Sequence, residues 1–132
     1  MKLLNATIAA LALTACSAPP ATMQIKRTPD SEPVTLIGTY SGGVETQARL
    51  EVSNGELVCV GSDPNAKTTM GWSVNRTAAI IAITCNDGRT GSVTLQTTTN
   101  GVDFSQGIGI GKLSDGSSIK VVVGEIGGIL EW

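Results

Sequence analysis

The sequence contains no histidine in 132 residues, and its aromatic side chains are limited to two Trp, one Tyr and one Phe. Without histidine, Ser-His and Cys-His nucleophiles and imidazole metal ligands are excluded, together with the side chain most often used for proton transfer near neutral pH. Carboxylates remain, but Asp87 and Asp115 both occur in Asp-Gly pairs, where aspartate has a structural role in turns. We therefore expect a protein that is not an enzyme and that has no catalytic residue, metal site or cofactor.

Charged residues are also few. They make up 15% of the chain, with nine Lys and Arg against eleven Asp and Glu, so the net charge is -2. Binding to nucleic acid depends on a concentration of Lys and Arg that neutralises phosphates, and the sequence has no such concentration. We exclude nucleic acid as a partner.

The N-terminal segment has the order of a secretory signal: Lys2, then a mostly apolar run, then Leu13-Thr14-Ala15-Cys16. This last group resembles the lipobox of bacterial lipoproteins. The resemblance implies that residues 1–15 are removed as a signal peptide, that Cys16 is acylated, and that the chain is anchored to a membrane. Ser17 follows the cysteine, which by the same resemblance favours the outer membrane of the cell envelope, with the domain facing the periplasm. The alternatives are a secretory signal in which a cysteine occurs by chance and a hydrophobic helix of the protein core.

Residues 17–33 contain four of the five prolines and show no sustained helical or strand period. Proline fixes its own backbone and favours extended conformations in the residue before it. We predict a lipid anchor and Pro-rich linker over residues 16–33, and a folded domain over residues 34–132.

The domain has the pattern of an antiparallel β protein. Apolar and polar residues alternate over 46–52 and 92–98, which predicts strands with one buried face. Four Asn-Gly or Asp-Gly pairs separate the apolar runs, and such pairs favour tight hairpin turns. We predict an all-β fold, a small antiparallel barrel or sandwich of seven to eight strands, with at most one helical turn between Pro64 and Ala79.

Two further cysteines, Cys59 and Cys85, lie in predicted strands. In an exported protein whose Cys16 carries lipid, the remaining pair favours a disulfide. A redox or metal pair is the rival interpretation, but the sequence has neither a Cys-x-x-Cys spacing nor a histidine to complete a zinc site. The loop closed by the disulfide includes residues 62–76, for which the sequence suggests no structural role. We assign any partner contact to this loop, with Trp72 as the anchor and Lys67 or Arg76 at the rim.

Glycine recurs at every second position in Gly107, Gly109 and Gly111, with Ile108 and Ile110 on the other face. The spacing indicates a strand rather than a phosphate-binding loop, because no helix follows. Such a strip allows close backbone approach, sharp coiling, or a large ring lying across it. Trp72 is the natural ring, and burial over this strip is the alternative to its role as an anchor.

The domain resembles small uncharacterised lipoproteins of Gram-negative bacteria, on the two cysteines, the segment 85–91 and the glycine strip, a resemblance that implies no activity. Two functions remain open. One is a structural or interaction lipoprotein that binds another envelope protein or the cell wall. The other is a barrel that holds a small ligand inside. The first predicts an exposed apolar patch or strand edge, and the second predicts an internal apolar pocket.

Overall fold

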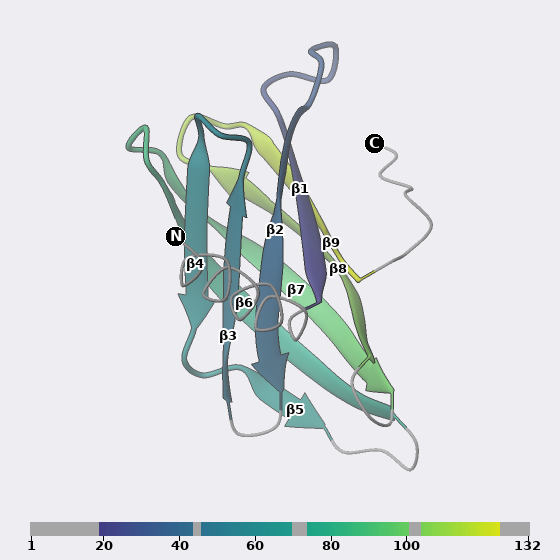
Figure 1. Cartoon of the computed structure of the whole chain (residues 1–132). Helices are drawn as coiled ribbons and strands as arrows, with labels where there is room; N and C mark the ends of the chain where they lie inside the picture. Colours follow the sequence, from purple (N-terminus) through teal and green to yellow (C-terminus); the bar gives the residue numbers. More distant parts are fainter. Residues whose placement is uncertain (1–18, 44–45, 70–73, 101–103, 125–132) are drawn as a thin grey trace, which may run out of the picture.

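The computed structural model describes residues 19–43, 46–69, 74–100 and 104–124. These residues form antiparallel strands joined by turns (Figure 1). The strands are β1 (Pro20–Lys26), β2 (Val34–Gly43), β3 (Thr46–Ser53), β4 (Val58–Asp63), β5 (Lys67–Thr69), β6 (Val74–Cys85), β7 (Thr90–Asn100), β8 (Phe104–Leu113) and β9 (Ser118–Val123).

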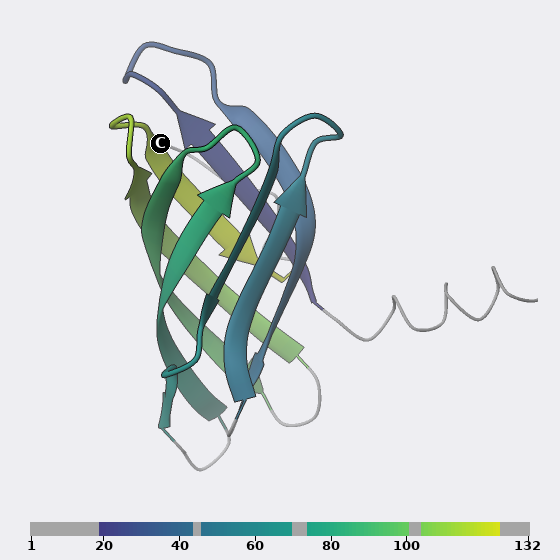
Figure 2. The ribbon, with the colours of Figure 1, turned by 90° about the vertical axis from the view of Figure 1, so that its left-hand side faces the viewer.

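The strands close into a barrel (Figure 2). Their order is β4-β3-β2-β1-β9-β8-β7-β6-β5, and a further pairing of β4 with β6 joins the two ends of the sheet. Eight strands therefore form the closed barrel, while β5 is an extra strand beside β6. The predicted all-β antiparallel fold is confirmed, and the choice between barrel and sandwich is settled in favour of the barrel.

The seam between β4 and β6 is short. It runs over four residue pairs, from Cys59 opposite Cys85 to Ser62 opposite Ala82. Beyond it, β5 takes the place of β4 beside β6. Asp63 lies at this exchange and accepts the backbone N–H of Ile80 on its Oδ2 atom at 2.8 Å. A carboxylate thus satisfies a strand donor at the point where one partner strand leaves and the next begins.

Side chains at alternate strand positions fill the barrel interior. An eight-stranded barrel has an interior just wide enough to hold its own inward-facing side chains. Tyr40 is the largest of the fully buried side chains. The other buried apolar residues of the main core are Ala21, Met23, Ile25, Leu36, Ala48, Leu50, Val52, Cys59, Ala79, Ile81, Ile83, Cys85, Val93, Leu95, Leu113, Ile119, Val121 and Val123.

The predicted linker over residues 16–33 is wrong for residues 20–26, which form β1. This strand pairs with β2 on one side and β9 on the other, and it buries Ala21, Met23 and Ile25 in the core. The folded domain therefore includes β1 and does not start at residue 34. Pro20 is compatible with the strand because it is the first residue, a position where proline is tolerated. The alternation of Ala21, Met23 and Ile25 is the sequence signal that the concentration of prolines obscured.

Three of the predicted hairpin turns are confirmed. Gly55, Gly88 and Gly116 have φ values of 97°, 95° and 91°, in the left-handed region that glycine tolerates. The fourth predicted turn includes Gly101, which lies outside the described residues. The helical turn considered between residues 64 and 79 is not formed by its described residues, since 67–69 and 74–79 belong to β5 and β6.

The glycine strip of β8 faces the barrel interior, with Gly107 and Gly109 buried, while Ile108 and Ile110 face outward. A Cβ atom added to Gly109 would lie 2.8 Å from Cγ1 of Val93 and 3.0 Å from Cδ1 of Leu95. Side chains of β7 thus occupy the volume that a β8 side chain would need. The expectation of close approach is confirmed, whereas Trp72, the ring expected to cover the strip, lies outside the described residues.

Candidate interaction surface

The outward side of strands β5 to β8 carries basic and apolar side chains together. We call this surface the β5–β8 face and define it by the following residues: Lys67, Thr69, Arg76, Ala78, Ile80, Thr94, Gln96, Thr98, Gln106, Ile108, Ile110 and Lys112. These four strands contain no Asp or Glu. Among the described strands, acidic residues occur only in β3 and β4, as Glu51 and Asp63.

Strand register brings the residues of this face into rows. Lys67 is opposite Ala78, which is opposite Gln96, which in turn is opposite Ile108. The neighbouring row contains Thr69, Arg76, Thr98 and Gln106. Together the two rows line a shallow groove of about 800 Å³. The groove offers two cations and two amide side chains to anything that lies across it.

Lys67 and Arg76, predicted as the rim of a partner site, both line this groove. They do so from strands, so the predicted loop over residues 62–76 is wrong at these two positions: Lys67 begins β5 and Arg76 lies within β6. The ion pairs among the described residues involve Arg49 and Arg89, not these two cations. Trp72, the predicted anchor, lies outside the described residues.

The apolar part of the face was not predicted as a site. Ile80, Ile108 and Ile110 are 65%, 53% and 64% exposed. Ile80 and Ile110 are both opposite Thr94 of β7, so they flank it within one row. Exposed isoleucines close to cations make this face a candidate interaction surface. The alternation of Ile with Gly in 107–111 was visible in the sequence, but it did not show which of the two faces outward.

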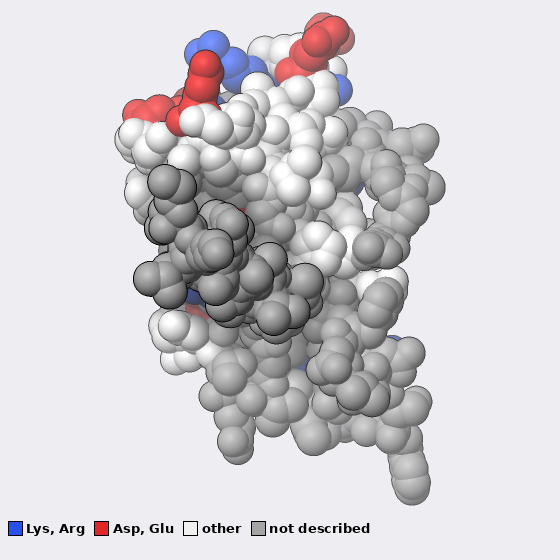
Figure 3. Space-filling view, viewed as in Figure 1, with Lys and Arg blue, Asp and Glu red and all other residues white. Residues whose placement is uncertain are grey.

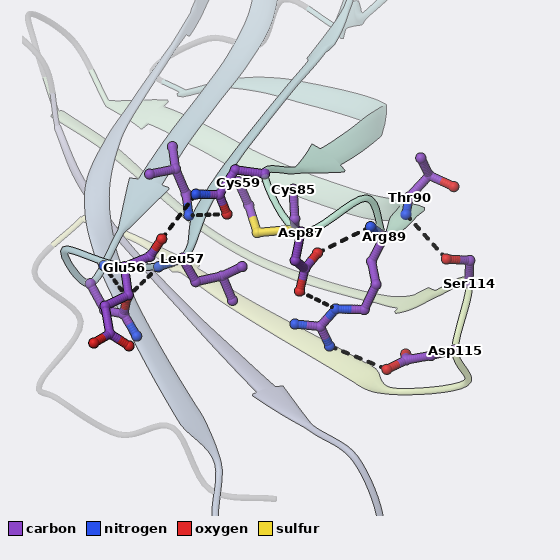
Figure 4. Close-up of a disulfide and its surroundings, with 12 residues drawn as sticks. Glu56, Leu57, Cys59, Cys85, Asp87, Arg89, Thr90, Ser114 and Asp115 are labelled. Carbon is purple, nitrogen blue, oxygen red and sulfur yellow. Dashed lines mark hydrogen bonds and ion pairs between the residues drawn. A yellow bond between two sulfur atoms is a disulfide. The ribbon is translucent and has the colours of Figure 1, made fainter.

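The predicted disulfide is confirmed. Cys59 and Cys85 are bonded, with Cα atoms 4.0 Å apart, at one end of the β4–β6 seam (Figure 4). Asn86, next along the chain, strengthens the same junction: its Oδ1 accepts the backbone N–H of Val58 at 3.0 Å, and its Nδ2 donates to the carbonyl oxygen of Glu56 at 2.9 Å. The disulfide and the amide together hold the β3–β4 turn against the β6–β7 turn.

Arg89 joins the β6–β7 turn to the β8–β9 turn (Figure 4). Its guanidinium donates to Asp87 at 2.8 Å and to Asp115 at 3.2 Å. The pKa of Asp87 is lowered, mainly by the hydrogen bond from the Arg89 backbone N–H, and the pKa of Asp115 is lowered mainly by the Ser117 backbone N–H. Arg89 is therefore committed to linking two hairpins at this end of the barrel, where the charged side chains gather in Figure 3.

Two smaller clefts lie near the same turns. One, of about 420 Å³, is lined by residues that include Arg27, Glu32 and the Arg89 ion pairs. The other, of about 500 Å³, is lined by residues that include Lys26, Arg27 and Lys112. No group of three or more His, Cys, Asp or Glu side chains among the described residues is placed to hold a metal ion.

Two buried side-chain hydroxyls among the described residues have no hydrogen-bond partner of good geometry, those of Tyr40 and Ser117. Tyr40 is 1% exposed, and its hydroxyl has no hydrogen-bond partner of good geometry among the described residues, although Thr97 and Asp63 are near. Burial raises the pKa of Tyr40 above its ordinary value of 10.0. The hydroxyl group thus stays neutral inside the barrel.

The N-terminal segment with Cys16 lies outside the described residues, and within them no helix has the length and apolar character needed to cross a membrane. Comparison of the chain with protein-family models, with curated proteins and with solved structures finds no match.

Proposed function

We propose that the chain is a membrane-anchored lipoprotein of the bacterial cell envelope whose barrel is an interaction module, and that contact is made through the β5–β8 face. In this proposal Cys16 carries the lipid, the outer membrane is the favoured location, and the barrel has no catalytic role. The observation that carries the proposal is the row of Ile80, Thr94 and Ile110, exposed on a face that bears Lys67 and Arg76 and no acidic side chain.

The alternative, a barrel that holds a small ligand inside, has less support. Such a barrel needs an internal apolar pocket. The inward positions of the described strands are instead occupied by buried side chains, and glycine replaces larger residues on β8 where the side chains of β7 fill the space. The groove of about 800 Å³ is lined mostly by outward residues such as Lys67 and Gln96, and the buried Thr77 and Thr97 also contribute to its lining.

Anchoring is tested with Cys16→Ser. We expect the wild-type protein to incorporate radiolabelled palmitate and to sediment with membranes, and the variant to lose both properties, because the acyl chains supply most of the membrane affinity. Equal palmitate incorporation by the variant would contradict the assignment of Cys16.

The interaction face is tested by placing a photo-cross-linking amino acid at Ile110 in intact cells. Ile37 on β2 is the matched control, since the two side chains have the same exposed fraction of 64% but lie on different sides of the barrel. We expect specific adducts from position 110 and few from position 37. Similar adducts from both positions, or none from position 110, would show that this face is not the contact surface.

A further inference from the structure

The point at which the chain enters the barrel is fixed by hydrogen bonds. The backbone N–H of Tyr40 donates to the carbonyl oxygen of Pro19 at 3.1 Å, and the N–H of Gly124 donates to that of Pro20 at 2.8 Å. Cys16 precedes Pro19 by three residues. Because an extended chain spans at most about 3.6 Å per residue, the Cα atoms of Cys16 and Pro19 lie within about 11 Å of each other. A barrel anchored through Cys16 is therefore held directly beside the membrane.

The β5–β8 face begins close to this entry point. One hydrogen-bonded row runs across the sheet through Ala21, Val123, Gly107, Thr97 and Thr77. Four interstrand steps of about 4.8 Å separate the first residue from the last, a path of about 19 Å along the sheet. Arg76 and Ala78 flank Thr77 on the outward side. Because β6 is four strands from β1 in the eight-strand ring, this row runs from the entry point through β8 and β7 to the side of the barrel opposite β1.

The described acidic residues outside β3 and β4 lie at the end of the barrel away from the chain entry, where Lys26, Arg27 and Arg89 also lie. β1 starts at the anchored end, while Asp87 and Asp115 lie in turns at the opposite end, with Glu32 and Glu56 in the other connections there (Figure 1). Anionic headgroups attract Lys and Arg near the membrane and repel carboxylates. An orientation with the β5–β8 face on the membrane brings Lys67, Arg76 and Lys112 to the surface, and the four strands of this face contain no carboxylate to oppose it.

We infer that the β5–β8 face docks on the anionic phospholipid surface of the membrane that holds the anchor. Lys67, Arg76 and Lys112 contact headgroups, and Ile108 and Ile110 enter the boundary between headgroups and acyl chains, as apolar side chains of interfacial proteins do. This inference rests on the proposed function, because it takes the lipid on Cys16 as the tether. An acidic protein partner satisfies the same charges, but the anchor places only the membrane within reach at all times.

The test uses the full lipidated protein reconstituted in vesicles of phosphatidylethanolamine with phosphatidylglycerol, compared with neutral phosphatidylcholine vesicles. A fluorophore is attached at Thr94→Cys, in the centre of the face. Thr35→Cys is the matched control, because Thr35 is exposed, lies in the same row through Gln24, Lys120 and Ile110, and belongs to β2 on the other side of the barrel. Quenching by a lipid-borne nitroxide reports contact with the membrane.

We expect strong quenching of the Thr94 label in anionic vesicles, weaker quenching in neutral vesicles, and little quenching of the Thr35 label in either. Removing one cation from a protein at an anionic surface lowers binding about fivefold. Arg76→Gln should therefore lower the ratio of docked to undocked protein about fivefold, while Arg49→Gln, an exposed arginine on β3, should leave it unchanged.

The other possible results of these measurements each contradict one step of the inference. If mass spectrometry of the intact protein shows that Cys16 is lipidated but the Thr94 label is not quenched on anionic vesicles, the docking inference is wrong. The assignment of Cys16 as the lipid anchor is then unaffected. Equal quenching in anionic and neutral vesicles removes the role of the cations. An unlipidated Cys16 removes the proposed function and this inference with it. Cross-linking from Thr94 in cells to a protein instead of to phospholipid assigns the face to a protein partner.

Discussion

The seam between β4 and β6 makes the barrel depend on the disulfide, and this dependence can be measured. The seam has four residue pairs, against eleven between β6 and β7, so it has few hydrogen bonds of its own to keep the barrel closed. The bond between Cys59 and Cys85 crosses the seam at one end and closes a loop with a sequence separation of 26. Replacing both cysteines by alanine removes this constraint while keeping small apolar side chains at both positions.

The expected loss follows from loop closure. In the chain-entropy model, a loop of this length stabilises the folded state by about 3.5 kcal/mol at 25 °C. With a urea m-value of about 1.5 kcal/mol/M, the unfolding midpoint of the double variant should fall by about 2 M. Hydrogen exchange should show the largest loss of protection at the seam, at the amides of Val60 and Ser62, because a short seam opens first.

The assay is urea unfolding followed by circular dichroism, with the wild-type protein reduced under denaturing conditions and refolded in reductant as the control. The reduced protein should have nearly the same midpoint as the double variant, since both lack the covalent link. A double variant with the wild-type midpoint would refute the reasoning, because it would show that the seam is held by its hydrogen bonds and packing alone. A large difference between the variant and the reduced protein would assign the loss to side-chain packing instead of the bond.

Three further predictions concern packing and titration. Gly111→Ala should destabilise the protein more than Gly109→Ala, because the added Cβ atom would meet the backbone carbonyl of Ser92 at position 111 but movable side chains at position 109. Thermal unfolding of the two variants measures the difference, and equal losses of stability would contradict this prediction. The phenolate absorbance of the single tyrosine, Tyr40, at 295 nm should appear at a higher pH in the folded protein than in the urea-unfolded chain. Stability should fall as the pH rises past the ordinary value of 10.0, because the unfolded chain releases the proton first. Tyr40→Phe should abolish this alkaline loss, which an unchanged pH profile would disprove. For Asp115, whose pKa is lowered in the folded state, the contribution to stability is present above the ordinary value of 3.8 and is lost as the pH falls through the folded value. Asp115→Asn should therefore lose less stability than the wild type when the pH is lowered past 3.8, and a variant as acid-sensitive as the wild type would count against this prediction.

Local chemistry explains which features were predictable from sequence. The Asn-Gly and Asp-Gly pairs require glycine in a left-handed conformation, and this requirement holds in any fold that contains the turn, so Gly55, Gly88 and Gly116 were placed correctly. The pairing of Cys59 with Cys85 was predictable by elimination, because only two cysteines remained after the assignment of Cys16. Lys67 and Arg76 were selected as candidates for a contact site, and the structure brings both into one groove.

Residues 20–26 show the limit of local interpretation. Prolines at positions 19, 20, 29 and 33 favoured a linker, yet the segment is a central member of the barrel. Its strand is stabilised by partners on both sides, β2 and β9, that are distant in sequence from one another. The burial of Ala21, Met23 and Ile25 in the barrel core outweighs the weak local preference of this segment for a strand. Only the closed sheet supplies both neighbours.

Residue type and local spacing were enough to predict the all-β class and three of the turns, and the number of cysteines was enough to predict the disulfide. The tertiary structure alone decided that Gly107 and Gly109 face inward while Ile108 and Ile110 are exposed, the reverse of the usual preference for apolar residues inside. The reason is volume. At Gly109 the side chains of Val93 and Leu95 occupy the space that an inward side chain would need, and at Gly107 the backbone oxygen of Gln96 and Cγ2 of Thr97 occupy it. Only glycine fits on that side of β8, and the isoleucines form the outward face.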